Sequence, residues 1–120
     1  MTSPSRTLSD TRFAPASRPG LEVVVATRKE PTQVFPAELL DCTRVDMQLR
    51  VAAPLEEDPN IVVRLQDESS GFQLSAAGAI SWQQDEESGS WRLGFQFTQE
   101  LDWETLGELC LCGILERPEA

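Results

Sequence analysis

The sequence has 120 residues, 10 of them Lys or Arg and 20 Asp or Glu, so it fits one domain and carries a formal net charge of −10. It contains no His and no Tyr, which excludes Ser-His and Cys-His nucleophile pairs, imidazole metal ligands and phenolic acids, so we expect a binding or signalling module rather than an enzyme. The acidity argues against DNA or RNA binding and against attraction to an anionic membrane surface.

Residues 1–19 are rich in Ser, Thr, Pro and Arg and have no sustained apolar period, which predicts a flexible arm. Three Arg residues and one Asp make this arm basic, whereas residues 20–120, the expected folded domain, are acidic. One interpretation is a solvated tail. The sharper interpretation is an arm that closes on an anionic ligand.

Four strands are expected in the first half of the domain. Residues 21–26 are dense in β-branched side chains, and residues 47–51 alternate apolar and polar side chains, and both patterns favour strands. Residues 34–43 and 61–65 are the second and fourth of these strands. Pro36 predicts an edge position or a bulge in the second strand.

Two similar segments, QDESSGFQL and QDEESGSWRL, place acidic and Ser residues before Gly71 and Gly89. Hairpin turns are expected there, because glycine adopts backbone angles that other residues avoid. A calcium loop is the alternative, but the ligand spacing of an EF-hand is absent, and no metal site is expected. The strands around the second turn, residues 72–82 and 91–97, contain four aromatic residues that we expect to be largely buried or packed at the junction of barrel and helix: Trp82, Trp91, Phe95 and Phe97.

The apolar spacing changes to about 3.6 residues over residues 101–114, which predicts a C-terminal helix. Gly107 and Gly113 each weaken such a helix by roughly 1 kcal/mol relative to Ala, so the helix is expected to depend on docking against the strands. Leu111 and Leu115 extend its apolar surface to a second side.

Six strands followed by one helix make an all-β fold with one C-terminal helix. A closed or nearly closed six-stranded antiparallel barrel is expected, because closure hides strand edges that otherwise invite aggregation. A two-sheet sandwich is the alternative, since periodicity does not decide which strands pair.

Cysteine usage and the N-terminal sequence indicate the compartment. Three Cys residues, an odd number without a CxxC pair, argue against a disulfide framework and a structural zinc site, and they suit a reducing compartment. The N-terminal stretch lacks the apolar core of a signal peptide, and no apolar run reaches membrane-spanning length. A cytoplasmic protein without membrane insertion is therefore expected.

The last predicted hairpin carries two patterns in a fixed order. Residues 74–82 read LSAAGAISW and end in aliphatic-x-Trp, and residues 91–97 read WRLGFQF, which is aromatic-x-x-Gly-x-x-Phe. In both patterns the chain, from about Leu21 onward, resembles a PilZ domain. The resemblance implies a six-stranded antiparallel barrel with a C-terminal helix, typically a receptor for the bacterial second messenger cyclic di-GMP, with the preceding arm in the place of the ligand loop.

The ligand motifs of that family are Arg-x-x-x-Arg in the N-terminal loop and Asp/Asn-x-Ser-x-x-Gly between the second and third strands. Guanidinium groups suit phosphates and guanine edges because of their fork-shaped donor geometry. This sequence has no Arg-x-x-x-Arg match, and Arg12 and Arg18 are the candidates nearest the first strand. In the second motif Asp41 matches, Thr43 replaces Ser and Asp46 replaces Gly. The resemblance implies that cyclic di-GMP binds at these residues, with like-charge repulsion from Asp46.

A second interpretation stays open for the same residues. Asp and Thr commonly hydrogen-bond to the local backbone, so turn capping is the alternative role of Asp41 and Thr43. An ordinary solvated arm is the alternative for Arg12 and Arg18.

Two functions follow from the resemblance. The first is a non-catalytic PilZ-type bacterial signalling domain, a cyclic di-GMP receptor and adaptor with weakened ligand motifs. The second is a degenerate PilZ-like protein-interaction module that binds no nucleotide, with Leu111 and Leu115 as its partner surface. A protein partner is expected in both, and no cofactor is expected in either. Cyclic di-GMP is the possible regulatory ligand of the first function only.

Overall fold

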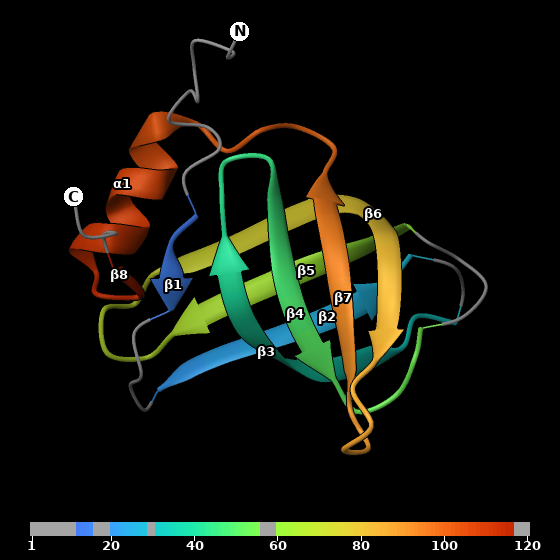
Figure 1. Ribbon diagram of the computed structural model, residues 1–120. Helices are drawn as coiled ribbons and strands as arrows, with labels where there is room; N and C mark the ends of the chain where they lie inside the picture. Colours follow the sequence, from blue (N-terminus) through green and yellow to red (C-terminus); the bar gives the residue numbers. More distant parts are fainter. Residues whose placement is uncertain (1–11, 16–19, 29–30, 56–59, 117–120) are drawn as a thin grey trace, which may run out of the picture.

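The computed structural model describes residues 12–15, 20–28, 31–55 and 60–116, and Figure 1 shows how its elements are arranged. The long strands are β2 (Leu21–Thr27), β3 (Val34–Cys42), β4 (Asp46–Val51), β5 (Asn60–Asp67), β6 (Gln73–Asp85) and β7 (Trp91–Phe97). The remaining elements are the short strands β1 (Ala14–Pro15) and β8 (Leu115–Glu116) and the helix α1 (Trp103–Leu111).

The long strands close into one barrel in the order β2-β3-β4-β7-β6-β5, and each neighbouring pair is antiparallel. This topology confirms the predicted six-stranded antiparallel barrel with one C-terminal helix and rules out the two-sheet sandwich. In Figure 1, α1 lies at one side of the barrel, next to the antiparallel β1–β8 pair. Closure gives every long strand a partner on both sides, which protects backbone groups that an open sheet exposes.

Alternating burial explains why these segments form strands. In β4, Met47, Leu49 and Val51 are buried, and the residues between them are less buried. The same period of two runs through β5, where Ile61 and Val63 are buried. A strand with this pattern lies on the barrel with one face in the core and the other toward solvent.

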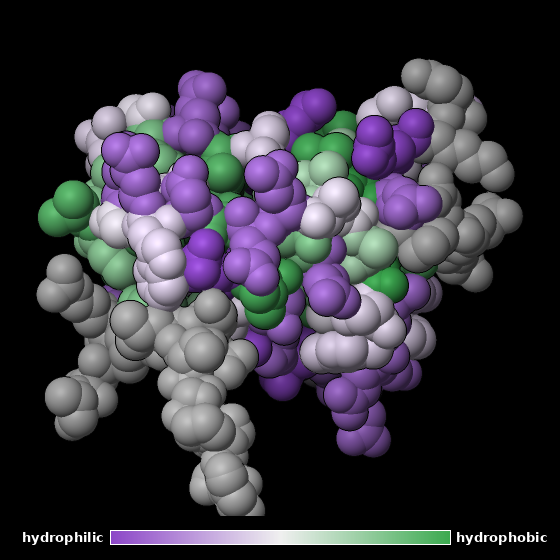
Figure 2. Space-filling model, turned by 90° about the horizontal axis from the view of Figure 1, so that it is seen from above, coloured by the Kyte–Doolittle hydropathy of each residue, from purple (hydrophilic) through white to green (hydrophobic). Residues whose placement is uncertain are grey.

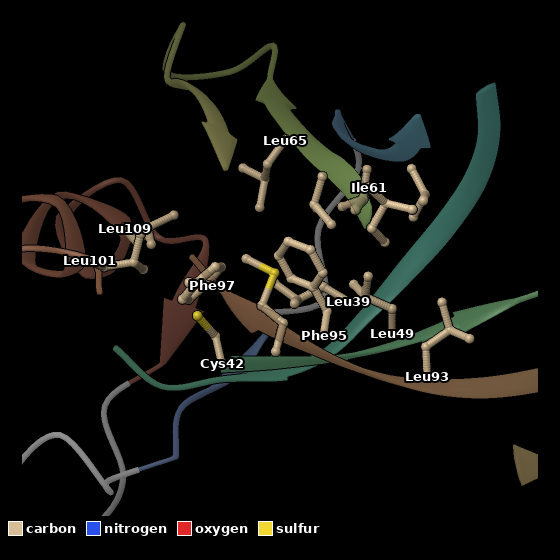
Figure 3. Packing of buried hydrophobic residues seen from close by; sticks show 14 of the residues in the cluster. Leu39, Cys42, Leu49, Ile61, Leu65, Leu93, Phe95, Phe97, Leu101 and Leu109 are labelled. Carbon is tan, nitrogen blue, oxygen red and sulfur yellow. The ribbon is translucent and has the colours of Figure 1, made fainter. Parts of the chain in front are cut away.

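The core fills the barrel and continues toward the helix. Figure 3 shows buried side chains from several strands pointing toward one another, with Leu101 and Leu109 close to Phe97 and Cys42. Phe95 is fully buried, and its ring meets the ring of Phe97 edge-on at a centroid distance of 5.5 Å. Burial of one such aromatic side chain contributes about 1.5–3 kcal/mol, so β7 supplies a large share of the core energy.

Two glycines of the β6–β7 pair hold aromatic rings against the backbone on opposite faces of the sheet. Inside the barrel, the Phe95 ring occupies the space that a Cβ atom on Gly78 would need. Outside the barrel, the Trp82 indole occupies the corresponding space at Gly94, its partner in the strand register. Both motifs at this hairpin therefore consist of residues that contact each other across the two strands.

The prediction that the four aromatic residues are largely buried is correct for Phe95 and Phe97 and wrong for Trp82, which is 41% exposed. The register of β6 shifts between Ile80 and Trp82. Because side chains alternate along a strand, this bulge turns Trp82 from the core face to the outer face. Trp91 is partly buried against the core.

The helix is shorter than the predicted range of residues 101–114. Gly113 has a φ of 78°, and its N–H donates a hydrogen bond to the carbonyl of Cys110, while the N–H of Ile114 donates to the carbonyl of Leu109. These two bonds form a Schellman motif, which ends a helix at a left-handed glycine. The chain then leaves the helix direction after Leu111 and enters β8.

Residues 12–15 of the predicted arm lie against the barrel. Phe13 and Cys42 exchange two backbone hydrogen bonds of 2.9 and 3.1 Å, and β1 pairs with β8. Part of the predicted flexible arm is thus paired with the barrel in this structure, and the rest of the arm, with Arg18, lies outside the described residues. In the described part of the chain, no helix is long and apolar enough to cross a membrane.

Candidate functional site

The end of β3 carries the first residue of the predicted ligand motif. One extra residue on β3 shifts the β3–β4 register between Leu39 and Asp41. This bulge lets both Leu39 and Cys42 face the core, three residues apart, while Asp41 lies at the surface and accepts a hydrogen bond of 3.1 Å from Gln48. The irregularity predicted at Pro36 thus lies farther along β3, where it aims the Asp41 carboxylate outward.

Thr43 closes the turn between β3 and β4. Its hydroxyl donates to the Asp46 carboxylate at 3.0 Å and accepts from the backbone N–H groups of Val45 and Asp46 at 3.0 and 3.1 Å. The residue is 1% exposed. Turn capping is therefore what Thr43 does in this structure, and its hydroxyl is already occupied by the turn.

Arg12 joins the arm to this turn. Its Nη2 atom lies 2.6 Å from Asp41 Oδ1 and 3.0 Å from Asp46 Oδ1. The hydrogen bond to Asp41 is the main cause that raises the pKa of Arg12 above its ordinary value, and the charges of both carboxylates add to it. The structure thus brings four of the five predicted ligand residues together, and we call Arg12, Asp41, Thr43 and Asp46 the turn cluster.

The turn cluster contains one guanidinium and two carboxylates, so its own charge is negative. Its polar groups satisfy one another, and Asp41 takes a further bond from Gln48. Among the described residues, the non-glycine with a positive φ is Glu87, so the backbone at Asp46 does not require glycine. Asp46 can therefore hold Arg12 at this position without backbone strain.

Cys42 lies beside the turn cluster but faces the core. Its side chain is fully buried, and its thiol donates to the carbonyl of Thr43 at 3.3 Å. Burial, with the nearby charges of Asp41 and Asp46, raises the pKa of Cys42 to about 12. Burial therefore favours the protonated form of this thiol.

A second ion cluster, which sequence reasoning missed, lies at the far end of β4 and β7. Arg50 contacts both oxygens of Glu86 at 2.8 and 3.2 Å, and Arg92 reaches the same carboxylate at 3.2 Å. Arg50 also contacts Glu38 at 3.1 Å. Arg50 stands directly opposite Arg92 in the register, and Glu86 bridges these two like charges and reduces their repulsion.

The bond from Arg50 is the main reason why the pKa of Glu86 falls to about 2. The sequence contained part of the signal for this cluster, since Arg50 alternates with buried residues of β4 and Arg92 directly precedes the buried residues of β7. What the sequence could not supply is the pairing of β4 with β7, two strands far apart in the chain. The cluster therefore depends on barrel topology.

The predicted partner surface is divided between two environments. Leu111 ends α1 and is 83% exposed. Leu115 was predicted to lie on the same helix, and this is wrong: it lies in β8 and is 2% exposed, because the glycine-ended helix stops before it. The other exposed large apolar side chain of α1 is Trp103, at 50% exposure. The Arg44 guanidinium lies 4.1 Å from the centroid of its ring.

A surface cavity of about 470 Å³ lies apart from both ion clusters, where β2 and β3 diverge beside β5. Its lining combines apolar residues of β2 and β3 with the carboxylates of Glu22 and Glu68. None of the sequence-predicted ligand residues lines it.

No protein-family model matches this chain, and a search of the curated proteins found no match. The functional interpretation therefore rests on the barrel and its clusters. Within the described ranges, no group of three Cys, Asp or Glu side chains is arranged to hold a metal ion. In the turn cluster the Arg12 guanidinium is held by the carboxylates of Asp41 and Asp46.

Proposed function

We propose that this chain is a non-catalytic, PilZ-like protein-interaction module in which an internal ion cluster takes the place of cyclic di-GMP. The closed antiparallel barrel, its C-terminal helix and the aromatic–glycine contacts of the β6–β7 hairpin support a PilZ-like domain. The observation that carries the proposal is the position of Arg12, within 3.0 Å of the carboxylates of both Asp41 and Asp46. The odd cysteine count leads us to place the domain in the cytoplasm.

Cyclic di-GMP would have to compete with Asp41 and Asp46 for Arg12. A phosphodiester must take the guanidinium away from two carboxylates that already contact it, and must then sit beside them. At a partly solvated site, two like charges about 4 Å apart repel by on the order of 1–4 kcal/mol. This repulsion weakens binding by about one to three decades, which removes most of the affinity a signalling receptor needs.

Calorimetric titration with cyclic di-GMP tests the proposal. The parent is expected to give no binding heat at high micromolar ligand, whereas Asp46→Asn and Asp46→Gly should bind detectably, and more tightly at low salt than at high salt. Glu22→Gln removes the same charge from an exposed position of β2 and serves as the matched control. Tight binding by the parent, unchanged by the Asp46 substitutions, contradicts the proposal.

A weak cyclic di-GMP receptor and adaptor is the second candidate. The observation that favours it is that Arg12 reaches the β3–β4 turn from the arm, so the two segments that carry the family's ligand motifs meet here. In that case cyclic di-GMP raises the melting temperature of the parent, since a ligand specific to the folded state stabilises it. A pulldown partner whose binding is insensitive to the nucleotide favours the interaction module instead.

A further inference from the structure

The outer face of α1 carries an apolar pair with a gap between its members. Trp103, Gly107 and Leu111 follow one another at intervals of four residues, so they lie along one side of the helix. Trp103 is 50% exposed and Leu111 is 83% exposed, whereas Leu106 and Leu109 on the other side are buried in the core. We call Trp103, Gly107 and Leu111 the α1 outer face.

Within the part of the chain that the structure describes, neither space nor backbone conformation requires glycine at position 107. A Cβ atom added there meets nothing within 4 Å, and its φ is not left-handed. Glycine in a helix interior is also less favourable than alanine. The six other glycines of the chain each have a positive φ or an aromatic ring in the space of a Cβ: Gly20, Gly71, Gly78, Gly89, Gly94 and Gly113.

A small residue between two large exposed apolar side chains makes a notch. Such a notch lets the side chain of a neighbouring helix approach the backbone closely, as ridges enter grooves in helix packing. Figure 2 shows hydrophobic atoms protruding at the left edge of the molecule, the side on which Figure 1 shows α1. Among the described residues outside the helix's own backbone, none lies within 4 Å of a Cβ atom built on Gly107.

The surroundings of the notch are acidic. Glu104 and Glu108 on α1 are exposed, whereas Glu100, just before the helix, already pairs with Arg44 at 3.6 Å. The last turn of α1 has no basic residue. Arg44 already lies over the Trp103 ring, which shows that this ring accepts a cation on its face.

We infer that the α1 outer face docks a basic amphipathic helix of a partner protein, which places one large apolar side chain over Gly107 and Lys or Arg side chains beside Glu104 and Glu108. Charge complementarity selects this occupant, because the helix and the chain as a whole are acidic. The inference rests on the proposed interaction function and names the partner class of that function.

The probe is a synthetic amphipathic helix of about 18 residues, five turns, with a Leu stripe flanked by Lys and Arg. The matched peptide carries Glu at the Lys and Arg positions. Affinity is measured by anisotropy of the labelled peptides, and the binding surface is mapped by amide chemical shifts. The basic peptide is expected to bind, to change the chemical shifts of the α1 amides and to lose affinity as salt rises. The acidic peptide is not expected to bind.

Variants separate docking from folding. Leu111→Ser and Gly107→Leu should each weaken peptide binding by about tenfold or more without lowering the melting temperature, because neither position is packed in the fold. Glu104→Gln should weaken binding and reduce its salt dependence. Val34→Ala removes another exposed apolar side chain, 53% exposed on β3, and should leave binding unchanged.

Several outcomes overturn the inference. The inference is wrong if the basic peptide does not bind at high micromolar concentration. It is also wrong if Gly107→Leu and Leu111→Ser leave binding unchanged, or if the amide chemical-shift changes are confined to the barrel. A peptide of residues 1–11 that binds this face more tightly than the probe assigns it to the chain's own arm, and self-association lost in Leu111→Ser assigns it to a second copy. The cyclic di-GMP titration is independent of these readouts, so failure of the proposed function is recognised separately.

Discussion

At the β6–β7 hairpin two aromatic rings lie on two glycines, whereas at the β3–β4 turn one guanidinium lies between two carboxylates. The hairpin contacts depend on shape and run from the core to the outer surface. The turn contacts are polar and partly exposed, with 40% of the Arg12 side chain accessible, and exposed ion pairs contribute only about 0–1 kcal/mol. The comparison indicates that the hairpin motif maintains the barrel, while the turn motif holds Arg12 at the barrel surface.

Substitution of the buried ring should have the largest effect. Phe95→Ala leaves a cavity against Gly78 and Phe97, and is expected to reduce the free energy of unfolding by about 3–5 kcal/mol. Urea denaturation followed by circular dichroism measures the change. A melting temperature equal to that of the parent would show that the hairpin does not support the core as described.

On the outer face of the same hairpin the expected effect is smaller. Gly94→Ala places a methyl group in the space of the Trp82 indole, and should destabilise by about 1–3 kcal/mol because the ring is displaced. In a Trp82→Ala background the same substitution should cost little, which a double-mutant cycle measures. Additive effects of the two changes would mean that ring and glycine do not interact.

At the turn, Thr43→Val should cost about 1–2 kcal/mol, because the N–H groups of Val45 and Asp46 lose their acceptor in a buried position. Thr43→Ser keeps the hydroxyl and is the matched control, with a smaller loss expected. Denaturation of both variants measures the difference. Equal losses in Val and Ser would show that the methyl group, rather than the capping hydroxyl, is what the turn requires.

Glu86, at the far end of the hairpin, predicts a pH dependence. Its pKa is about 2 in the folded protein, below the ordinary value of 4.5, so the unfolded chain takes up the proton first as the pH falls. The contribution of Glu86 to stability is therefore complete above the ordinary pKa and is lost as the pH falls toward 2.

Melting temperatures of the parent and Glu86→Gln measure this contribution. The difference should be largest near neutral pH and should shrink in acid, and Glu22→Gln, a charge on a different strand, should show no such trend. A difference that stays constant down to about pH 2 would contradict the assigned role of the Arg50 and Arg92 contacts.

The regular alternation was sufficient to predict most of the strands, whereas the choice of a barrel over a sandwich needed the pairing that the structure shows. Met47, Leu49 and Val51 set the phase of β4, and the turn residues separate it from its neighbours. Local irregularities of the strands were harder to predict from the sequence. The bulge before Trp82 reverses which face that ring occupies, and a shift of one residue in register is not visible in a pattern of period two. The Schellman motif at Gly113 could have been read from the glycine itself, as a helix end.

The candidate site was predictable as a set of residues and not as a set of contacts. The resemblance to the PilZ ligand motif groups Asp41, Thr43 and Asp46, and for Thr43 it leaves ligand contact and turn capping as the two roles. The contact of Arg12 with two carboxylates required the fold, since the residues are separated by about thirty positions and meet because Phe13 pairs with Cys42. The sequence had assigned Arg12 to an arm without a fixed position.

The most direct measurement follows the Arg12 side chain itself. In a two-dimensional NMR titration with cyclic di-GMP, the Arg12 Nε–H signal and the amides of residues 43–46 report whether the guanidinium leaves Asp41 and Asp46. We expect the chemical shifts of these signals to stay unchanged in the parent up to high micromolar ligand and to change together in Asp46→Asn. A saturable, joint movement of the same signals in the parent would contradict it, because the nucleotide would then displace the internal carboxylates.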